Sequence, residues 1–281
     1  MAEKMKKMHL FSKLLRFVTY LGATISFVVL FFLVVYILIK GVPHLKPSLF
    51  ALKYTSDNVS LLPALINTVI MTVLTLLIAA PIGIFSAIYL VEYAKKGSKI
   101  VKLIRTTAET LSGIPSIVYG LFGYLFFVLA LKWDYSIMAG SITLVIMILP
   151  LIMRTTEEAL LGVPDSYREA SFGLGAGKLR TVFRVVLPAA ISGIVSGVIL
   201  AIGRVVGETA ALIYTAGTVA KLPKSLMDSG RTLAIHMYTL SSEGLHMNEA
   251  YATAVVLLVL VLGINALSNY AAKRLTKGNE K

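Results

Sequence analysis

The chain has 281 residues, of which 57% are hydrophobic and 15% are charged, and its formal net charge is +13. Soluble domains hold roughly 45–50% apolar and about 25% charged residues even when glycine is counted as apolar. The composition therefore excludes a disordered chain, a collagen and an ordinary cytosolic enzyme, and it indicates that the solvent is lipid. Because the chain has no cysteine, disulfides, thiolate metal sites and a cysteine nucleophile are also excluded.

Six apolar segments long enough to cross a membrane follow one another along the chain, since a spanning helix needs about 20 mostly apolar residues. They are Phe17–Ile39, Leu62–Val91, Thr110–Leu131, Ser136–Met153, Val185–Thr215 and Ala250–Leu267. We expect Pro81 to kink the second segment, Pro115 and nearby glycines to interrupt the third, and Pro150 to end the fourth. The predicted fold class is all-α, a polytopic membrane protein with six transmembrane helices.

The positions of Lys and Arg predict the orientation in the membrane. The N-terminal leader, the loops 95–105 and 154–184, and the tail from Lys273 hold 19 of the 27 basic residues, whereas the three alternate loops hold 7. By the positive-inside rule both termini are cytoplasmic. The net charge is thus explained by topology, without a nucleic-acid partner. The first apolar segment is too long for a cleaved signal peptide and lacks a small-residue cleavage site, so we expect it to remain.

The cytoplasmic loop between the fourth and fifth segments has the local pattern of a short helix. Ser166 and Glu169 follow Pro164 at the spacing of a capping box, in which the serine hydroxyl accepts an amide and the glutamate reaches back. The helix is expected to end near Gly175, where the chain turns before it re-enters the membrane. The sequence Gly175–Lys178 is not a P-loop, because Phe172 and Leu179 occupy positions that need Gly and Ser or Thr.

Arg204 and Glu208 lie deep in the fifth segment, where each charge costs about 2.5–3.5 kcal/mol at mid-bilayer depth. Their i,i+4 spacing would let them pair on a continuous helix, on one stripe with Gly193, Gly197 and Ala201 that faces other helices. Two interpretations remain open. Arg204 supplies positive potential to an anion path and Glu208 orients it, or the two form a structural ion pair. The four histidines are scattered, so no metal site is predicted, and no catalytic residues are predicted either.

A longer motif in the cytoplasmic loop resembles the EAA loop of ABC-importer permeases, whose pattern is E-A-A-x3-G-x9-I-x-L-P. Here Ser171 replaces the second alanine and Val185 the isoleucine. The resemblance implies the type I importer permease fold, with a coupling helix in a loop at about 154–188 that docks on a partner ATPase. It also implies that this chain needs no cofactor, because the partner binds the ATP. The implied docking residues are Glu169, Ala170, Ser171, Gly175, Leu187 and Pro188.

Three further segments are similar to phosphate-importer permeases of the PstA type: Gly113–Gly123, Pro150–Ala170, and the R-x-x-G-E-T-A run that starts at Arg204. This resemblance implies a substrate path with Arg204, Glu208, Thr209 and Arg154, in a prokaryotic cytoplasmic (inner) membrane. The implied partners are a companion permease (PstC type), two ATP-binding subunits (PstB type) and an extracytoplasmic phosphate-binding protein (PstS type). A permease for molybdate or sulfate, and a stand-alone secondary transporter or channel, are the alternatives.

The predicted organisation has three parts. Residues 1–60 comprise the basic leader, the first transmembrane helix and an external loop. Residues 61–275 form the permease core with spans two to six, and residues 276–281 form a cytoplasmic tail.

Overall fold

The computed structural model describes the backbone of residues 2–95 and 97–277 and the side chains of residues 11–95 and 97–270. Within that part of the chain every regular element is a helix, which confirms the all-α prediction. Five helical segments are long and apolar enough to span a membrane, and a bent pair of helices makes a sixth if it is counted as one span. Positions 278–281 of the predicted tail lie outside the described residues.

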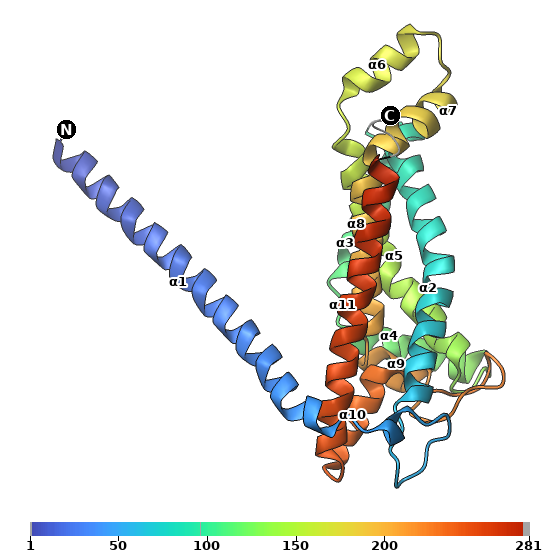
Figure 1. Ribbon diagram of the computed structural model, residues 1–281. Coiled ribbons are helices and arrows are strands. Elements are labelled where there is room, and N and C mark those ends of the chain that lie inside the picture. The colour runs from blue at the N-terminus through green and yellow to red at the C-terminus, as the bar shows by residue number, and fades with distance from the viewer. Residues whose placement is uncertain (1, 96, 278–281) are drawn as a thin grey trace.

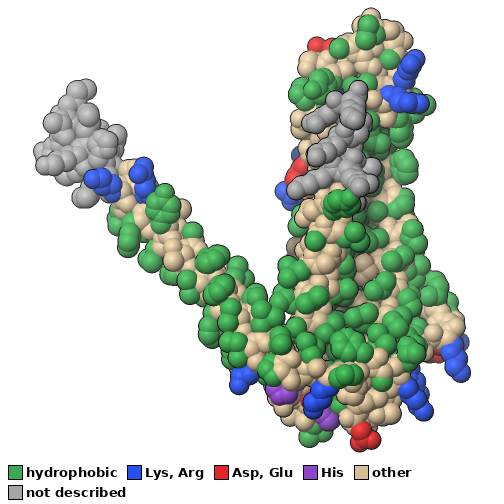
Figure 2. Space-filling view, in the orientation of Figure 1, with side chains coloured by type: hydrophobic (Ala, Val, Ile, Leu, Met, Phe, Trp, Pro, Cys, Tyr) green, Lys and Arg blue, Asp and Glu red, His purple; other side chains and the backbone are tan. Residues whose placement is uncertain are grey.

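The first helix, α1 (Ala2–Gly41), stands away from the other helices (Figure 1). Apolar side chains cover it, as they cover the sides of the bundle, while the basic side chains gather toward the ends (Figure 2). It joins the bundle near its C-terminal end, where the Tyr36 ring lies 5.9 Å from that of Tyr251 on α11 (Met247–Lys277). Gly41 is required there, because a Cβ atom would collide with the Tyr251 carbonyl and with Val255.

The core of the bundle is α5 (Ile137–Leu161), which packs between α2 (Leu62–Ile88) and α8 (Leu187–Val206). The predicted small-residue stripe of α8 makes this close approach possible. A Cβ atom on Gly193 would meet Ala159 of α5, and one on Gly197 would meet Thr155. Small residues at this spacing let helix backbones come together where lipid gives no hydrophobic drive between helices.

Pro150 does not end the fourth span, and that prediction is wrong. Helix α5 begins after Ser136, whose hydroxyl accepts the amide of Ala139 at 3.2 Å, and it continues through Pro150 to Leu161. A proline inside a helix removes one backbone hydrogen bond. A transmembrane helix tolerates this loss because neighbouring helices can satisfy the freed backbone group. Pro150 is buried in the bundle.

Two of the predicted spans are discontinuous. The third consists of α3 (Lys99–Ser112) and α4 (Ser116–Gly123) with its extension η4 (Tyr124–Ala130), and the two parts are bent by 101°. The interruption predicted there is confirmed. The fifth span was predicted to be continuous, and this is wrong: α8 ends at Val206, and α9 (Ala210–Thr215) begins after a three-residue break.

Short helices cover both ends of the bundle. At one end lie η1 (Val42–His44), η2 (Pro47–Phe50) and α10 (Leu233–Glu243). The other end carries α6 (Asp165–Gly173), α7 (Lys178–Thr181) and two π-helical turns, η3 (Tyr89–Tyr93) after α2 and η5 (Val182–Val186) before α8.

The predicted capping box is also wrong. Helix α6 begins directly after Pro164, so Ser166 already lies in its first turn and no side chain caps it. Asp165 in that turn places a negative charge near the positive end of the helix dipole instead.

Candidate functional site

Arg204 lies in the last turn of α8, directly before the break in the fifth span. Its side chain is half-buried, and no carboxylate of the described residues lies within 4.0 Å of its guanidinium group. The predicted pair with Glu208 is not formed, because the helix ends between the two residues. Glu208 is buried, and its Oε1 accepts the amide of Ala211 at 3.0 Å in the first turn of α9.

The second discontinuous span meets the first at this point. Helix α4 packs so closely on α9 that a Cβ atom on Gly120 would lie 2.8 Å from the Cα of Ala211. Tyr119 donates a hydrogen bond of 2.8 Å to the carbonyl of Leu111 across the α3–α4 bend, and it lies close enough to Arg204 to interact with its charge. Irregular backbone at membrane depth is tolerated where it is buried in protein or lines a cavity. Arg204 therefore lies near both breaks: it interacts with Tyr119 just after the first, and it directly precedes the second.

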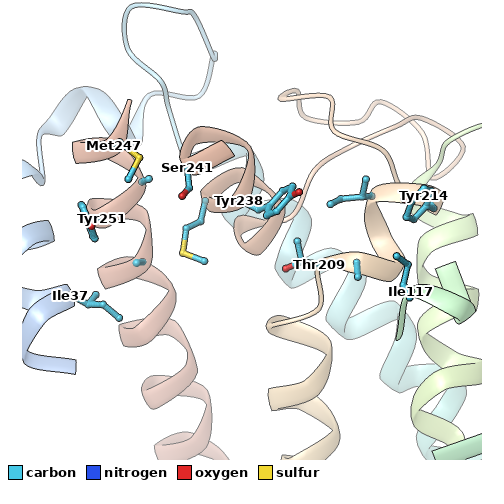
Figure 3. Close-up of a pocket in the computed structure, with 13 residues that line it drawn as sticks. Ile37, Ile117, Thr209, Tyr214, Tyr238, Ser241, Met247 and Tyr251 are labelled. Carbon is cyan, nitrogen blue, oxygen red and sulfur yellow. The ribbon is translucent and has the colours of Figure 1, made fainter. Parts of the chain in front are cut away.

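Thr209 opens onto a cavity of about 640 Å³ between α9, α10 and α11, with Ile37 of α1 and Ile117 of α4 at its edges (Figure 3). Most of the lining is apolar, with hydroxyl groups from Thr209, Ser241 and three tyrosines. Of the predicted path residues, Thr209 lines this cavity. Arg204 is not part of its lining, and Glu208 faces the protein interior.

Arg154 lies near the opposite end of the bundle, on α5. Its Nε donates to Glu158 Oε1 at 2.9 Å, and its side chain is 61% exposed. It borders a small pocket of about 220 Å³ between α3 and α5, where Arg105 pairs with Glu157. The lining carries two arginines and three glutamates, so its net charge is negative. Arg154 is therefore already matched by carboxylates in this chain.

The residues predicted to dock on an ATPase fall into two groups. Glu169 and Ala170 on α6 and Gly175 after it are exposed, and Gly175 has a positive φ of 82° where the chain turns. Ser171 instead faces the body of the protein, since its hydroxyl lies 2.8 Å from that of buried Thr181. Leu187 and Pro188 are half-buried at the start of α8.

Sequence reasoning missed the apolar residues of this surface. Three large apolar side chains are exposed in this otherwise polar loop: Leu174, which is 90% exposed, Tyr167 and Phe172. No residue of α6 is buried. Exposed apolar side chains on one projecting segment make that segment a candidate interaction surface. The sequence signal that could have indicated this surface is the presence of three large apolar residues in a loop that is otherwise rich in charge.

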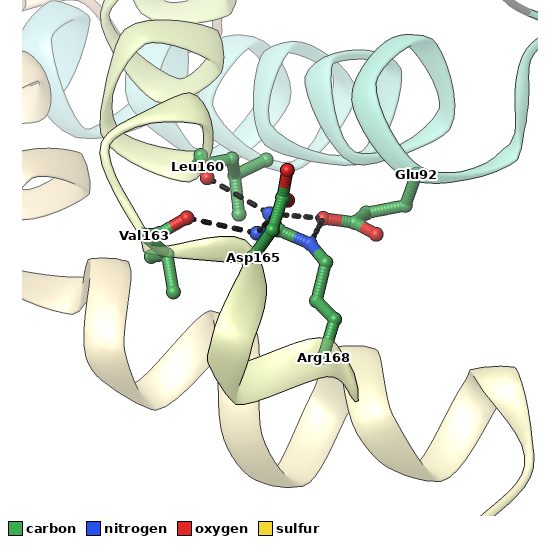
Figure 4. A network of polar contacts seen from close by, with 5 residues as sticks. All are labelled: Glu92, Leu160, Val163, Asp165 and Arg168. Carbon is green, nitrogen blue, oxygen red and sulfur yellow. Dashed lines mark hydrogen bonds and ion pairs between the residues drawn. The ribbon is translucent and has the colours of Figure 1, made fainter. Parts of the chain in front are cut away.

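A second feature that sequence reasoning missed is a polar network between α6 and the neighbouring helix ends (Figure 4). Arg168 donates from Nε and Nη2 to Glu92 Oε1, at 3.1 and 2.7 Å. It also donates to the carbonyls of Val163 and Leu160, at 2.8 and 3.0 Å, and to Asp165 at 3.2 Å. Because Glu92 is 76 positions away in sequence, no local pattern could indicate this contact.

Residues 79–278 match the family described as binding-protein-dependent transport system inner membrane component, which covers more than two thirds of the chain. The chain belongs to this family. It is the multi-pass permease subunit of a binding-protein-dependent ABC importer in the inner membrane, where a separate subunit handles ATP and a binding protein delivers the cargo.

Curated relatives cover most of this permease. It is 35% identical over 260 residues to the probable ABC transporter permease protein YqgI of Bacillus subtilis, which is 86% of this chain and 88% of the relative. It is 35% identical over 256 residues to the phosphate transport system permease protein PstA of Pasteurella multocida, which is 86% of this chain and 91% of that protein. With PstA of Mycobacterium leprae the identity is 36% over 205 residues, or 72% of this chain and 67% of that one.

Solved structures show the same fold at low sequence identity. A chain of a bacterial alginate ABC transporter, solved with an alginate-bound periplasmic protein, matches with a TM-score of 0.70 at 16% identity, over 94% of this chain and 95% of its own. An inward-facing MetNI methionine ABC transporter matches with a TM-score of 0.59 at 21% identity, over 76% of this chain and 93% of its own. The fold of the permease core is thus shared with importers of different cargo.

Proposed function

We propose that this permease is one of two membrane subunits of an ATP-driven phosphate importer. The observation that carries the proposal is Arg204, a half-buried arginine in a membrane span with no carboxylate within 4.0 Å among the described residues. A charge at this depth is costly unless it faces a partner or a water-filled path. A guanidinium group is well suited to an oxyanion, to which it donates charge-assisted hydrogen bonds. The relatives named as phosphate permeases support phosphate as the cargo.

The proposed complex contains a companion permease of the PstC type, two ATP-binding subunits of the PstB type and a phosphate-binding protein of the PstS type. Residues 61–275 would form the permease core. The start of α1 and the end of α11 lie toward the end of the molecule that carries α6 (Figure 1). This arrangement supports an orientation with both termini and the docking helix in the cytoplasm, as the distribution of basic residues predicts.

In this proposal, closure of the ATP-binding subunits moves α6, and the bundle switches between outward and inward access as a rigid-body change. Arg204 offers positive potential where the discontinuous spans meet. Glu208 makes no ion pair with it within 4.0 Å, and its carboxylate accepts an α9 amide instead. Exposed Glu169, Ala170 and Gly175, together with the apolar residues beside them, would contact the ATP-binding subunit.

Uptake of labelled phosphate tests the cargo. Cells with and without this chain are compared at low external phosphate, with excess molybdate or sulfate as competitors. We expect an ATP-dependent uptake that is lost without the chain and that only phosphate competes for. Normal phosphate uptake with loss of another oxyanion's import would overturn phosphate and retain the importer.

A matched pair of variants tests Arg204. Loss of a charge-assisted contact worth about 1.5–3 kcal/mol lowers uptake at limiting phosphate by roughly 10- to 150-fold, so Arg204→Gln should show a loss in that range. Lys102→Gln removes the same charge from an exposed position on α3 and should leave uptake unchanged. Intact uptake by Arg204→Gln in a normally assembled complex would contradict the assigned role.

A further inference from the structure

Arg168 is the side chain that ties the projecting helix α6 to the membrane bundle. Although α6 has no buried residue, the Arg168 side chain is only 14% exposed, and the Glu92 side chain is 8% exposed. Glu92 lies in η3, directly at the end of α2. The guanidinium group points from α6 toward the bundle and contacts that end and the end of α5 together (Figure 4).

The geometry of this contact is restrictive. Two nitrogens of Arg168 share Glu92 Oε1, and two hydrogen bonds go to the carbonyls of Leu160 and Val163, at and just beyond the C-terminal end of α5. A further one goes to Asp165 on α6 itself. Leu160 lies in the last turn of α5, where carbonyls lack donors from a following turn of helix, and its carbonyl also accepts the Val163 amide at 3.3 Å. The planar guanidinium group with its fixed donors therefore holds three segments in one relative orientation.

On its other side α6 is joined to α7 by the hydroxyl contact between Ser171 and Thr181. Thr181 is buried and leads through η5 directly into α8. The two contacts thus connect α6 to α2 and α5 through Arg168, and to α8 through Ser171. These are the three helices that form the packed core of the bundle.

We infer that the Arg168–Glu92 pair is a positioning link that makes α6 and the ends of α2 and α5 move as one body when the partner ATPase closes. Arg168 would thereby transmit the displacement of α6 to the helices around the path. Buried ion pairs contribute little net stability but fix geometry in some proteins. This inference rests on the ATP-driven importer function, and it does not depend on which anion is carried.

The direct test measures whether α6 moves relative to the end of α2. The chain has no cysteine, so the exposed positions Ser166 on α6 and Lys95 after η3 can be changed to cysteine and spin-labelled in the complex with its ATPase. We expect one narrow distance between the labels that is the same in nucleotide-free and ATP-trapped complexes. A change of more than about 2 Å, the size of helix shifts at switching interfaces, would overturn the link. This measurement needs ATP but no cargo, so its failure is distinct from a failure of the phosphate proposal.

Variants test the consequence for transport. In proteoliposomes with the binding protein, Arg168→Gln and Glu92→Gln should lower the cargo moved per ATP hydrolysed by roughly 5- to 150-fold, the usual range for coupled sites. They should also broaden the label distance. The exchanged pair Arg168→Glu with Glu92→Arg should restore part of the ratio, and Lys102→Gln should leave it unchanged. If Arg168→Gln moves as much cargo per ATP hydrolysed as the native protein, the inference is overturned. If that variant does not assemble, the test is the distance between the labels at positions 166 and 95 in the protein that keeps Arg168 and Glu92.

Discussion

Glu208 accepts the backbone amide of Ala211 at 3.0 Å, and it does so from the break between two helices that lie in one apolar run of the sequence. The carboxylate satisfies a free amide in the first turn of α9, and its charge lies near the positive end of that helix. Arg204, four residues earlier, has no carboxylate within 4.0 Å of its guanidinium group among the described residues.

The first prediction concerns the independence of these two charges. Glu208→Ala should destabilise the protein by about 0.5–2 kcal/mol, as the loss of a capping acceptor does. Because Glu208 and Arg204 do not pair, the coupling energy between Glu208→Ala and Arg204→Gln should stay within about 0.5 kcal/mol. Thermal unfolding of the purified single and double variants measures it. A larger favourable coupling would show that the ion pair forms after all.

The second prediction concerns the contact between the discontinuous spans. A Cβ atom on Gly120 would lie 2.8 Å from the Cα and 3.0 Å from the carbonyl oxygen of Ala211, and backbone cannot give way as a flexible side chain does. Gly120→Ala should therefore lower stability by about 1–3 kcal/mol through overpacking. The unfolding midpoint measures this. Gly263→Ala on α11, where nothing lies within 4 Å, is the matched control and should not lower the midpoint.

The third prediction concerns the proposed docking surface around α6. Leu174 is 90% exposed in the loop that follows α6. If it enters the interface with the ATPase as an apolar anchor, Leu174→Asp should cost about 2 kcal/mol of binding, or roughly 30-fold in affinity. Co-purification and titration with the ATPase measure the loss. Leu245, which is 80% exposed after α10, provides the control, and binding that survives Leu174→Asp would remove this residue from the interface.

Apolar runs and local turn signals are enough to predict most of the spans and the short helix before the fifth span, because both depend on residues that are near one another in sequence. The bend after Ser112 is foreseeable for the same reason, since glycine and proline at 113–115 cannot continue a helix. The break after Val206 was missed although a local signal was present, because Gly207 follows the last helical residue, where glycine often ends a helix. The glycine does not indicate that the Glu208 carboxylate then accepts the Ala211 amide.

Tertiary contacts account for the other differences. Pro150 ends a helix in isolation, yet α5 continues through it because the surrounding helices hold the turn in place. The Arg168–Glu92 pair joins residues 76 positions apart, so it depends on the packed arrangement of α2, α5 and α6. For the same reason Ser171, which the motif assigns to the docking face, has its hydroxyl against Thr181.

His236 on α10 is the group whose titration should limit stability in acid. Its ring is fully buried against Tyr54, and the guanidinium group of Arg231 lies 4.8 Å from the centre of the same tyrosine ring. Burial, and then the charge of Arg231, lower the pKa of His236 from 6.5 to about 3, although the Val59 backbone acts in the opposite direction. In the folded protein His236 therefore stays neutral at a pH where the unfolded chain already binds a proton.

The sign of the fourth prediction follows from this difference. As pH falls from about 6.5 toward 3, protons bind the unfolded chain preferentially, so the free energy of unfolding falls. At pH 5 the loss from this group should be about 2 kcal/mol, because each unit of pKa difference corresponds to about 1.4 kcal/mol. His236→Phe should remove that part of the decline between pH 7.5 and pH 5, measured as unfolding midpoints. His246→Phe, at a partly exposed histidine, should retain it. Equal declines in the native protein and His236→Phe would show that another group governs the acid sensitivity.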